Sequence, residues 1–243
     1  MKAIDMIVFL CSPDDISARW FVASLRHDHG IAAQIITPQE LVYAPDMEHR
    51  LDGTDTFSSV TLKSHGTLDS SSITGVVNRL EFLPDAHLAR VSATDRAYSQ
   101  QELLAIWSRW ISALACPVIN RPTAISVTGP LFHPAIWQHH AAAAGLPTAP
   151  MLYDVDLPDP VPPVPVHSVI VCRDQCHGAS LPPDLFGACC DLARYVGFDM
   201  LEVMFGQGPS GAVFSHASPV PDLSRAQPGL LAQVAHIFQE GAP

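Results

Sequence analysis

The sequence predicts an α/β protein: an N-terminal parallel sheet with flanking helices, followed by a smaller α+β C-terminal part. Three observations support this prediction. Up to about residue 150, short apolar runs alternate with amphipathic segments, as they do in βαβ units. Residues 154–165 then contain five prolines and three aspartates, which excludes a helix or a central strand there. After this stretch the signals change to strand, helix, hairpin and helix.

These signals divide the chain into three parts. We expect an α/β domain over residues 1–151, an extended Pro-rich linker over residues 152–167 and an α+β domain over residues 168–243.

The first elements of the N-terminal domain follow directly from apolar patterning. Residues 4–11 form a run that is apolar except for Asp5, typical of a strand buried on both faces. Residues 17–27 predict an amphipathic helix that ends at Gly30, and residues 32–36 predict a second strand. The polar stretch that follows predicts hairpins or a loop around one weak strand at residues 59–62.

The rest of this domain predicts a long helix between two strands, and then a further helix. Residues 75–79 and 117–122 are apolar strands, and residues 99–102 form a capping box that predicts a helix start. Trp107 and Trp110 recur at helical spacing on that helix and are expected in the core. A second helix is expected to begin near Pro134.

The C-terminal part contains shorter elements. We expect a strand at residues 168–172, a helix from about residue 183 to Gly197, a hairpin that pairs residues 200–205 with 212–215, and a last helix around residues 230–238.

Charge and hydropathy exclude several classes of function. The chain has 13 Lys and Arg against 24 Asp and Glu, a formal net charge of −11, which argues against nucleic-acid binding. No apolar stretch is long enough to span a bilayer, and the apolar start lacks the pattern of a secretory signal. We therefore expect a cytoplasmic protein without a membrane partner, whose six cysteines are reduced and mostly in the core.

Two Asn-Arg pairs are the most informative local feature. Asn78-Arg79 and Asn120-Arg121 each end an apolar strand, and the carboxyl ends of parallel strands are where α/β folds bind ligands. Arginine forks at this edge would suit a carboxylate or a phosphate. The alternative is structural: each arginine caps its strand or pairs with a nearby acid such as Glu81 or Asp95.

Taken together, these elements resemble the ATP-grasp superfamily of carboxylate–amine ligases, in particular its peptide-modifying and ribosomal-protein glutamate-ligase type. The resemblance covers residues 1–151 and 168–240. Its first part is carried by the strands at residues 75–79 and 117–122, the Trp-rich helix, Trp137 and residues 144–150. In that family these elements form the domain that precedes the ATP-binding part.

The second part of the resemblance lies at residues 197–205 and 212–219, which are similar to the closing pattern of the family. There the pattern supplies acidic and amide ligands to magnesium. Laid residue by residue, the expected Asp, Glu and Asn fall on Met204, Phe214 and His216. Since Mg²⁺ needs oxygen donors, the resemblance implies that the metal ligands are absent, and we expect neither ATP nor Mg²⁺ as a cofactor.

Lysine usage points the same way. The only lysines are Lys2 and Lys63, whereas the family uses lysines of its ATP-binding subdomain against the phosphates. The Pro-rich residues 154–165 stand where that subdomain should begin, so we expect the ATP-clamping lobe to be missing. The arginines beyond residue 151 supply too little positive charge for a triphosphate.

Three functions follow, and the sequence leaves them open. The first is a non-catalytic, degenerate ATP-grasp-like protein that acts with a peptide or a biosynthetic ligase partner. The second is an ATP-dependent carboxylate–amine ligase active only with another subunit; Arg79, Arg121, Glu202 and His216 would be its groups to test. The third is a binding module for a small acidic metabolite at the Asn-Arg strand ends. Apolar surface left by a lost lobe also predicts a homodimer.

Overall fold

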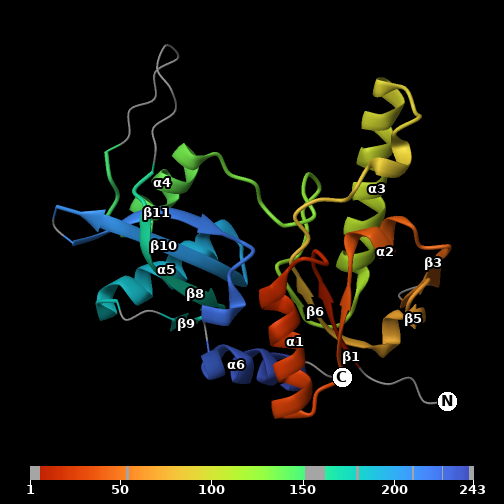
Figure 1. Ribbon diagram of the computed structural model, residues 1–243, viewed down its shortest axis with the longest axis horizontal. Helices are drawn as coiled ribbons and strands as arrows, with labels where there is room; N and C mark the ends of the chain where they lie inside the picture. The colour runs from red at the N-terminus through yellow and green to blue at the C-terminus, as the bar shows by residue number, and fades with distance from the viewer. Residues whose placement is uncertain are drawn as a thin grey trace. The chain divides into compact units, whose positions relative to one another are not determined.

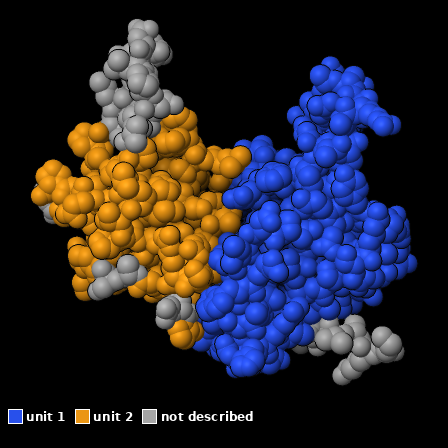
Figure 2. Space-filling model, viewed as in Figure 1, with its two compact units in different colours: residues 1–129, 231–243 blue, residues 130–230 orange. Residues whose placement is uncertain are grey.

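A computed structural model describes residues 6–52, 55–150, 162–178, 181–209, 211–225 and 227–240. The chain divides into two compact units, residues 1–129 with 231–243 and residues 130–230, coloured separately in Figure 2. The α/β class predicted from the sequence is confirmed. Residues 151–161, most of the predicted linker, lie outside the described residues, and the segment that follows enters a strand at Pro165. The domain boundaries expected from the sequence remain a prediction.

Unit 1 is built on a parallel sheet with the order β2-β1-β6-β7. Its central strand β1 is buried along most of its length, as expected for an apolar run that has a neighbour on each side. The strands are β1 (Met6–Leu10), β2 (Ala33–Ile36), β6 (Ile73–Asn78) and β7 (Val118–Ile119).

The helices of unit 1 begin and end at residues with clear capping roles. Helix α1 (Ile16–His29) begins at the N-cap Asp15 and ends at Gly30, whose φ of 64° is left-handed. Thr37 and Glu40 form a capping box at the short α2 (Pro38–Val42). Helix α3 (Ala93–Ala113) is the long, Trp-rich helix (Figure 1).

The predicted start of α3 at Ser99 is wrong. Ser92 is the N-cap, and its side chain accepts a hydrogen bond from the Asp95 backbone N–H. The reason is that the Ser92 side chain already caps the first turn and its hydroxyl donates to the Asp95 carboxylate at 2.7 Å, so Ser99 is the seventh residue of the helix.

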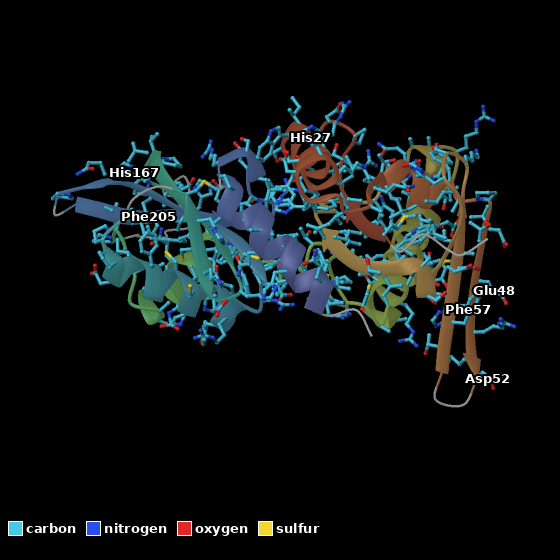
Figure 3. The ribbon with its side chains drawn as sticks, turned by 90° about the horizontal axis from the view of Figure 1, so that it is seen from below. His27, Glu48, Asp52, Phe57, His167 and Phe205 are labelled. Atoms are coloured by element: carbon cyan, nitrogen blue, oxygen red, sulfur yellow. The ribbon has the colours of Figure 1, made fainter. Side chains whose placement is uncertain are left out.

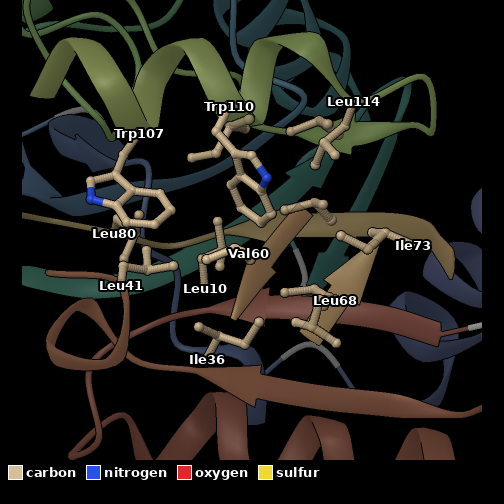
Figure 4. Close-up of a cluster of buried hydrophobic side chains, with 14 of the residues drawn as sticks. Leu10, Ile36, Leu41, Val60, Leu68, Ile73, Leu80, Trp107, Trp110 and Leu114 are labelled. Atoms are coloured by element: carbon tan, nitrogen blue, oxygen red, sulfur yellow. The ribbon is translucent and has the colours of Figure 1, made fainter. Parts of the chain in front are cut away.

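The polar stretch after α2 forms a second, antiparallel sheet, which confirms the hairpins expected from the sequence over the alternative of a loop around one strand. Its order is β3-β4-β5, with β3 (Asp46–Asp52), β4 (Asp55–Leu62) and β5 (Gly66–Asp69). Figure 4 shows Val60 and Leu68 of this sheet packed below α3, beside Leu10 and Ile36 of the parallel sheet. Trp107 and Trp110 are 3% and 0% exposed within this cluster, which confirms their prediction as core residues.

Unit 2 contains an antiparallel sheet with the order β11-β10-β8-β9, covered on one face by helices α4 (Pro134–Ala143) and α5 (Pro183–Val196). Side chains alternate along β10, so Leu201, Val203 and Phe205 join the apolar core with the helices. The strands are β8 (Pro165–Cys172), β9 (Gln175–Gly178), β10 (Met200–Gly208) and β11 (Gly211–Ser218).

The last helix, α6 (Gln227–Glu240), contributes its later residues to unit 1. There the Phe238 ring lies against Gly75 of β6, so closely that a β-carbon on Gly75 would come within 2.1 Å of the ring. Three single-turn 3₁₀ helices complete the described elements: Ser70–Ser72, Ala86–Leu88 and Leu223–Arg225. Among the described residues, no helix has both the length and the apolar content to cross a bilayer.

Candidate functional site

Asn78, the last residue of β6, joins two segments of unit 1. It is 1% exposed, and its side-chain amide donates to the carbonyl oxygens of Asn120 (2.8 Å) and Val127 (2.6 Å). Its side-chain oxygen accepts from the backbone N–H of Leu80 at 3.2 Å. The Asn78 side chain thus ties the end of β6 to the loop that follows β7.

Arg79 follows Asn78 and forms an ion pair with Asp15. The Arg79 side chain is 3% exposed and that of Asp15 is 12% exposed, and the Arg79 Nε and Nη2 atoms lie 2.8 and 2.7 Å from one oxygen of the Asp15 carboxylate. The Asp15 side chain also accepts from the Ala18 backbone N–H at the start of α1. The acidic partner of Arg79 is therefore Asp15, and not the nearby Glu81 that the sequence suggested.

The second Asn-Arg pair is arranged differently. Asn120 is 2% exposed and has a φ of 60°, in the left-handed region that asparagine tolerates better than most residues. The side chain of Arg121, an exposed residue, donates to the Cys116 carbonyl oxygen at 3.4 Å. The four residues do lie where parallel strands end, and Asn78 contacts Asn120 directly. Their role in ligand binding remains a prediction.

In unit 2, Glu202 lies on the sheet face that α4 and α5 do not cover. It is 3% exposed, and its carboxylate accepts from the Asp222 backbone N–H at 3.0 Å. Arg225 lies 3.4 Å from the other carboxylate oxygen and 3.0 Å from Asp222. The same arginine donates to the Ser168 hydroxyl at 3.3 Å. A buried carboxylate is thus neutralised by one half-exposed arginine.

An open hollow of about 390 Å³ adjoins this arginine, lined by residues 165–168 and Arg225.

His216 shares the face of Glu202. In the register of β10 and β11, Met204 pairs with His216 and Glu202 pairs with Ser218. Burial lowers the pKa of His216, and the negative charge of Glu202 partly opposes this by raising it. The His216 Nδ1 atom lies 3.1 Å from the Ser215 hydroxyl, which in turn donates to the Pro163 carbonyl oxygen.

Phe214 points to the opposite face. The register shifts by one residue between Met204 and Phe205, so that Phe205 pairs with Phe214 and Ser215 has no opposite residue. Phe214 is fully buried in the core that α4 and α5 cover. Strict alternation would place Phe214 and His216 on one face, and the bulge separates them.

These positions can be tested against magnesium chemistry. The resemblance placed the ligands at Met204, Phe214 and His216, which offer a thioether, a phenyl ring and an imidazole. None is a hard oxygen donor, and the phenyl ring lies within the apolar core. Within the described ranges, no group of three or more His, Cys, Asp or Glu side chains could hold a metal ion. The donor set therefore does not fit Mg²⁺.

Asp15, Asp222 and Arg225 are part of these arrangements but were not singled out from the sequence. Residues 12–15 read Ser-Pro-Asp-Asp, and an aspartate just before a helical segment is a helix-start signal. This signal could have indicated that Asp15 caps α1, but not that Asp15 pairs with Arg79. Asp222 and Arg225 lie 20 and 23 residues from Glu202 in a segment without a strong pattern.

Comparison with known proteins gave matches at the level of structure alone. No protein-family model and no curated protein matches the sequence. Three solved structures align over nearly their full length. They are macrocyclase MdnB from Microcystis aeruginosa MRC (14% identity, TM-score 0.66, 98% of each chain covered), a RiPP-associated ATP-grasp ligase from Chryseobacterium gregarium (8%, 0.69, 99% of this chain and 98% of that one), and ATP-grasp ligase PsnB (15%, 0.68, 99% and 100%).

The PsnB structure contains a variant of its minimal precursor, Mg and ADP, and the Chryseobacterium gregarium structure contains ADP with a leader and core peptide. At such low identity, the similarity establishes architecture rather than activity. It agrees with the parallel sheet of unit 1 and the antiparallel sheet of unit 2, and this chain has the fold of the ATP-grasp ligases.

Proposed function

We propose that this chain is a non-catalytic protein with the ATP-grasp fold, which binds a peptide or a biosynthetic ligase partner. One observation carries the proposal: the sheet face of Glu202 lacks oxygen donors at the positions where the resemblance requires them. Met204 and His216 pair there across the two strands, while Phe214 belongs to the core on the other face.

The charges of unit 2 support the same proposal. Residues 130–230 contain no lysine, and their three arginines are Arg173, Arg194 and Arg225. Arg194 pairs with Asp191, and Arg225 pairs with Asp222 and Glu202. Two of the three arginines therefore already neutralise acids of the chain itself, which leaves too little positive charge for a triphosphate.

Two of the similar structures support a peptide as the partner. The MdnC macrocyclase, 11% identical with a TM-score of 0.68, is bound with its precursor peptide, and the Chryseobacterium gregarium ligase is in complex with a leader and core peptide. A protein that has this fold but no nucleotide chemistry would still use the fold to recognise a peptide.

Nucleotide binding is the first test. Isothermal titration of the full chain with Mg-ATP and with Mg-ADP is expected to give no binding, and phosphate release is expected to match that of a buffer blank. The variant Met204→Asp with His216→Asn places two oxygen donors on this face and serves as the matched control for metal chemistry. Mg-dependent ATP turnover by the wild-type chain, alone or with a peptide, would overturn the proposal.

Peptide binding is the second test. Fluorescein-labelled peptides encoded by short reading frames beside this gene serve as probes in fluorescence anisotropy, without nucleotide. Saturable binding that is unchanged by Mg-ATP is expected. If no such peptide binds, and a ligase encoded nearby does not co-purify with the chain, the binding role is refuted.

A further inference from the structure

Two of the six cysteines are partly exposed, and these two lie side by side in unit 2. They are Cys176 and Cys190, whose Sγ atoms lie 3.6 Å apart. All six cysteines are free, and the other four are buried: Cys11, Cys116, Cys172 and Cys189. The thiols that solvent can reach are therefore the ones that contact each other.

Cys176 lies on an edge strand and faces α5. Strand β9 is the edge of the antiparallel sheet next to β8, in the sheet that Figure 3 shows with His167 of β8 and Phe205 of β10 labelled. In the register of β8 and β9, Cys176 pairs with Val171, a buried residue of the core that α5 covers. Because paired residues of neighbouring strands share a face, the Cys176 side chain lies on the α5 side of the sheet.

Helix α5 presents the second thiol to this strand. Phe186 and Cys190 are four residues apart, so they lie on one side of the helix, and both pack against the border of the unit 2 core. The Cys176 thiol also lies 3.5 Å from the Phe186 carbonyl oxygen. The neighbouring Cys189 is fully buried and points in another direction, since adjacent helical residues are about 100° apart.

The distance between the two sulfurs is short enough for a disulfide to form. A disulfide bond is about 2.0 Å long, and it requires side chains that point toward each other. At 3.6 Å the two sulfurs touch without a bond, and side-chain rotations that bring them about 1.6 Å closer would join them. The bond would connect two elements of unit 2 whose cysteines are 14 positions apart in the chain.

We propose that Cys176 and Cys190 form a redox site, at which a peroxide oxidant joins the two sulfurs in a disulfide that ties the edge strand β9 to α5. In a reducing compartment such a disulfide is transient and senses the redox conditions. This inference does not rest on the proposed function.

The oxidation balances with hydrogen peroxide as the oxidant. Burial and the neighbouring Cys190 thiol raise the pKa of Cys176, and the thiolate is the reactive form, so we expect Cys190 to react first. The Cys190 thiolate attacks one oxygen of the peroxide, the O–O bond breaks, and the released hydroxide takes up a proton to become water. Cys190 is then a sulfenic acid.

The second step forms the disulfide. The Cys176 sulfur attacks the Cys190 sulfur, the S–O bond breaks, and the hydroxyl group leaves as water with the proton of the Cys176 thiol. Two thiols are thereby oxidised to one disulfide, and one peroxide is reduced to two waters.

Peptide mapping after peroxide treatment tests the site. The full chain is treated with hydrogen peroxide, its remaining thiols are blocked with iodoacetamide, and it is cleaved before aspartates, which separates residues 174–183 from residues 184–190. The expected product is a disulfide between these two peptides that disappears on reduction. Cys176→Ser and Cys190→Ser are expected to lose it. Cys189→Ala is the matched control, because Cys189 shares a peptide with Cys190, and it is expected to keep the bond.

Thermal melting tests the effect on the fold. A bond between positions 14 apart restricts the unfolded chain, so the oxidised chain is expected to melt about 3–10 °C above the reduced chain. The same treatment should not raise the Tm of Cys176→Ser or Cys190→Ser. Melting of the reduced variants confirms that they are folded, which these partly exposed positions favour.

Three results would overturn the proposal. The first is the absence of a disulfide between residues 174–183 and 184–190 after peroxide treatment. The second is a disulfide between these peptides that persists in either serine variant. The third is an oxidised chain that melts no higher than the reduced one.

Discussion

Breaking the ion pair between Arg79 and Asp15 distinguishes a structural role of Arg79 from a role in ligand binding. Arg79→Met removes the guanidinium but keeps an unbranched side chain of similar reach. In the folded chain the Asp15 carboxylate, 12% exposed, would then lack the two donors that lie 2.8 and 2.7 Å from it. If Arg79 stabilises the fold, the loss of these donors lowers the free energy of unfolding. If Arg79 instead binds a ligand, the free energy of unfolding stays the same.

The burial of both partners sets the magnitude. Removing one partner of a buried pair typically costs about 3–5 kcal/mol, because a charge is left uncompensated. Asp15 keeps its helix-capping bond from Ala18, which places the expected loss near the lower end of that range. For a chain of this length, about 3 kcal/mol corresponds to a decrease in Tm of about 6–12 °C.

Urea unfolding followed by tryptophan fluorescence is a suitable assay, since Trp107 and Trp110 are buried in the core of the same unit. A double-mutant cycle with Asp15→Asn completes it. Asparagine retains an oxygen that caps α1 but carries no charge. The double variant is expected to be more stable than the sum of the two single losses predicts, by about 1–3 kcal/mol.

Two results would refute the reasoning. If Arg79→Met unfolds within about 0.5 kcal/mol of the wild-type chain, the pair contributes as little as an average surface substitution. If the two single losses simply add in the cycle, Arg79 and Asp15 are not coupled, and Arg79 becomes available for a carboxylate or phosphate ligand.

The remaining predictions concern backbone strain, close packing and pH. Asn120→Ala is expected to lose about 1–2 kcal/mol, measured by urea unfolding, whereas Asn120→Gly should lose less because glycine adopts the φ of 60° freely. Gly75→Ala should destabilise by about 1–3 kcal/mol, since its β-carbon would overlap the Phe238 ring, and a smaller residue at position 238 should recover part of the loss. Burial lowers the pKa of His216 in the folded chain below its ordinary value of 6.5. The contribution of His216 to stability is therefore complete above pH 6.5 and decreases as the pH falls from 6.5 toward the folded pKa. His216→Gln should flatten this part of the pH dependence of Tm.

Local patterns predicted the fold where they were strong. The apolar runs of β1 and β6 and the end of α1 at Gly30 were evident because burial and capping act within a few residues. Strand β3 was missed because its half-buried residues are Met47 and His49, and the histidine interrupts the apolar alternation that predicts a strand. The partner of Arg79 was missed for another reason: Asp15 lies 64 residues away, and a tertiary contact leaves no local pattern.

The sequence singled out Met204, Phe214 and His216 in unit 2, but it did not predict on which face of the sheet each side chain lies. Aligning residue types placed Phe214 and His216 two positions apart, which in a regular strand means a shared face. The bulge at Ser215 gives them opposite faces, a property of the register with β10 that no single strand encodes. Magnesium binding at these positions would therefore need more than three substitutions. Phe214→Glu alone would bury a carboxylate in the core beneath α4 and α5, at a cost that unfolds many proteins, unless the register of β11 also changed. Substitutions at Met204 and His216 can therefore add oxygen donors on the face of Glu202. They do not recreate the full ligand set, because Phe214 stays in the apolar core on the opposite face.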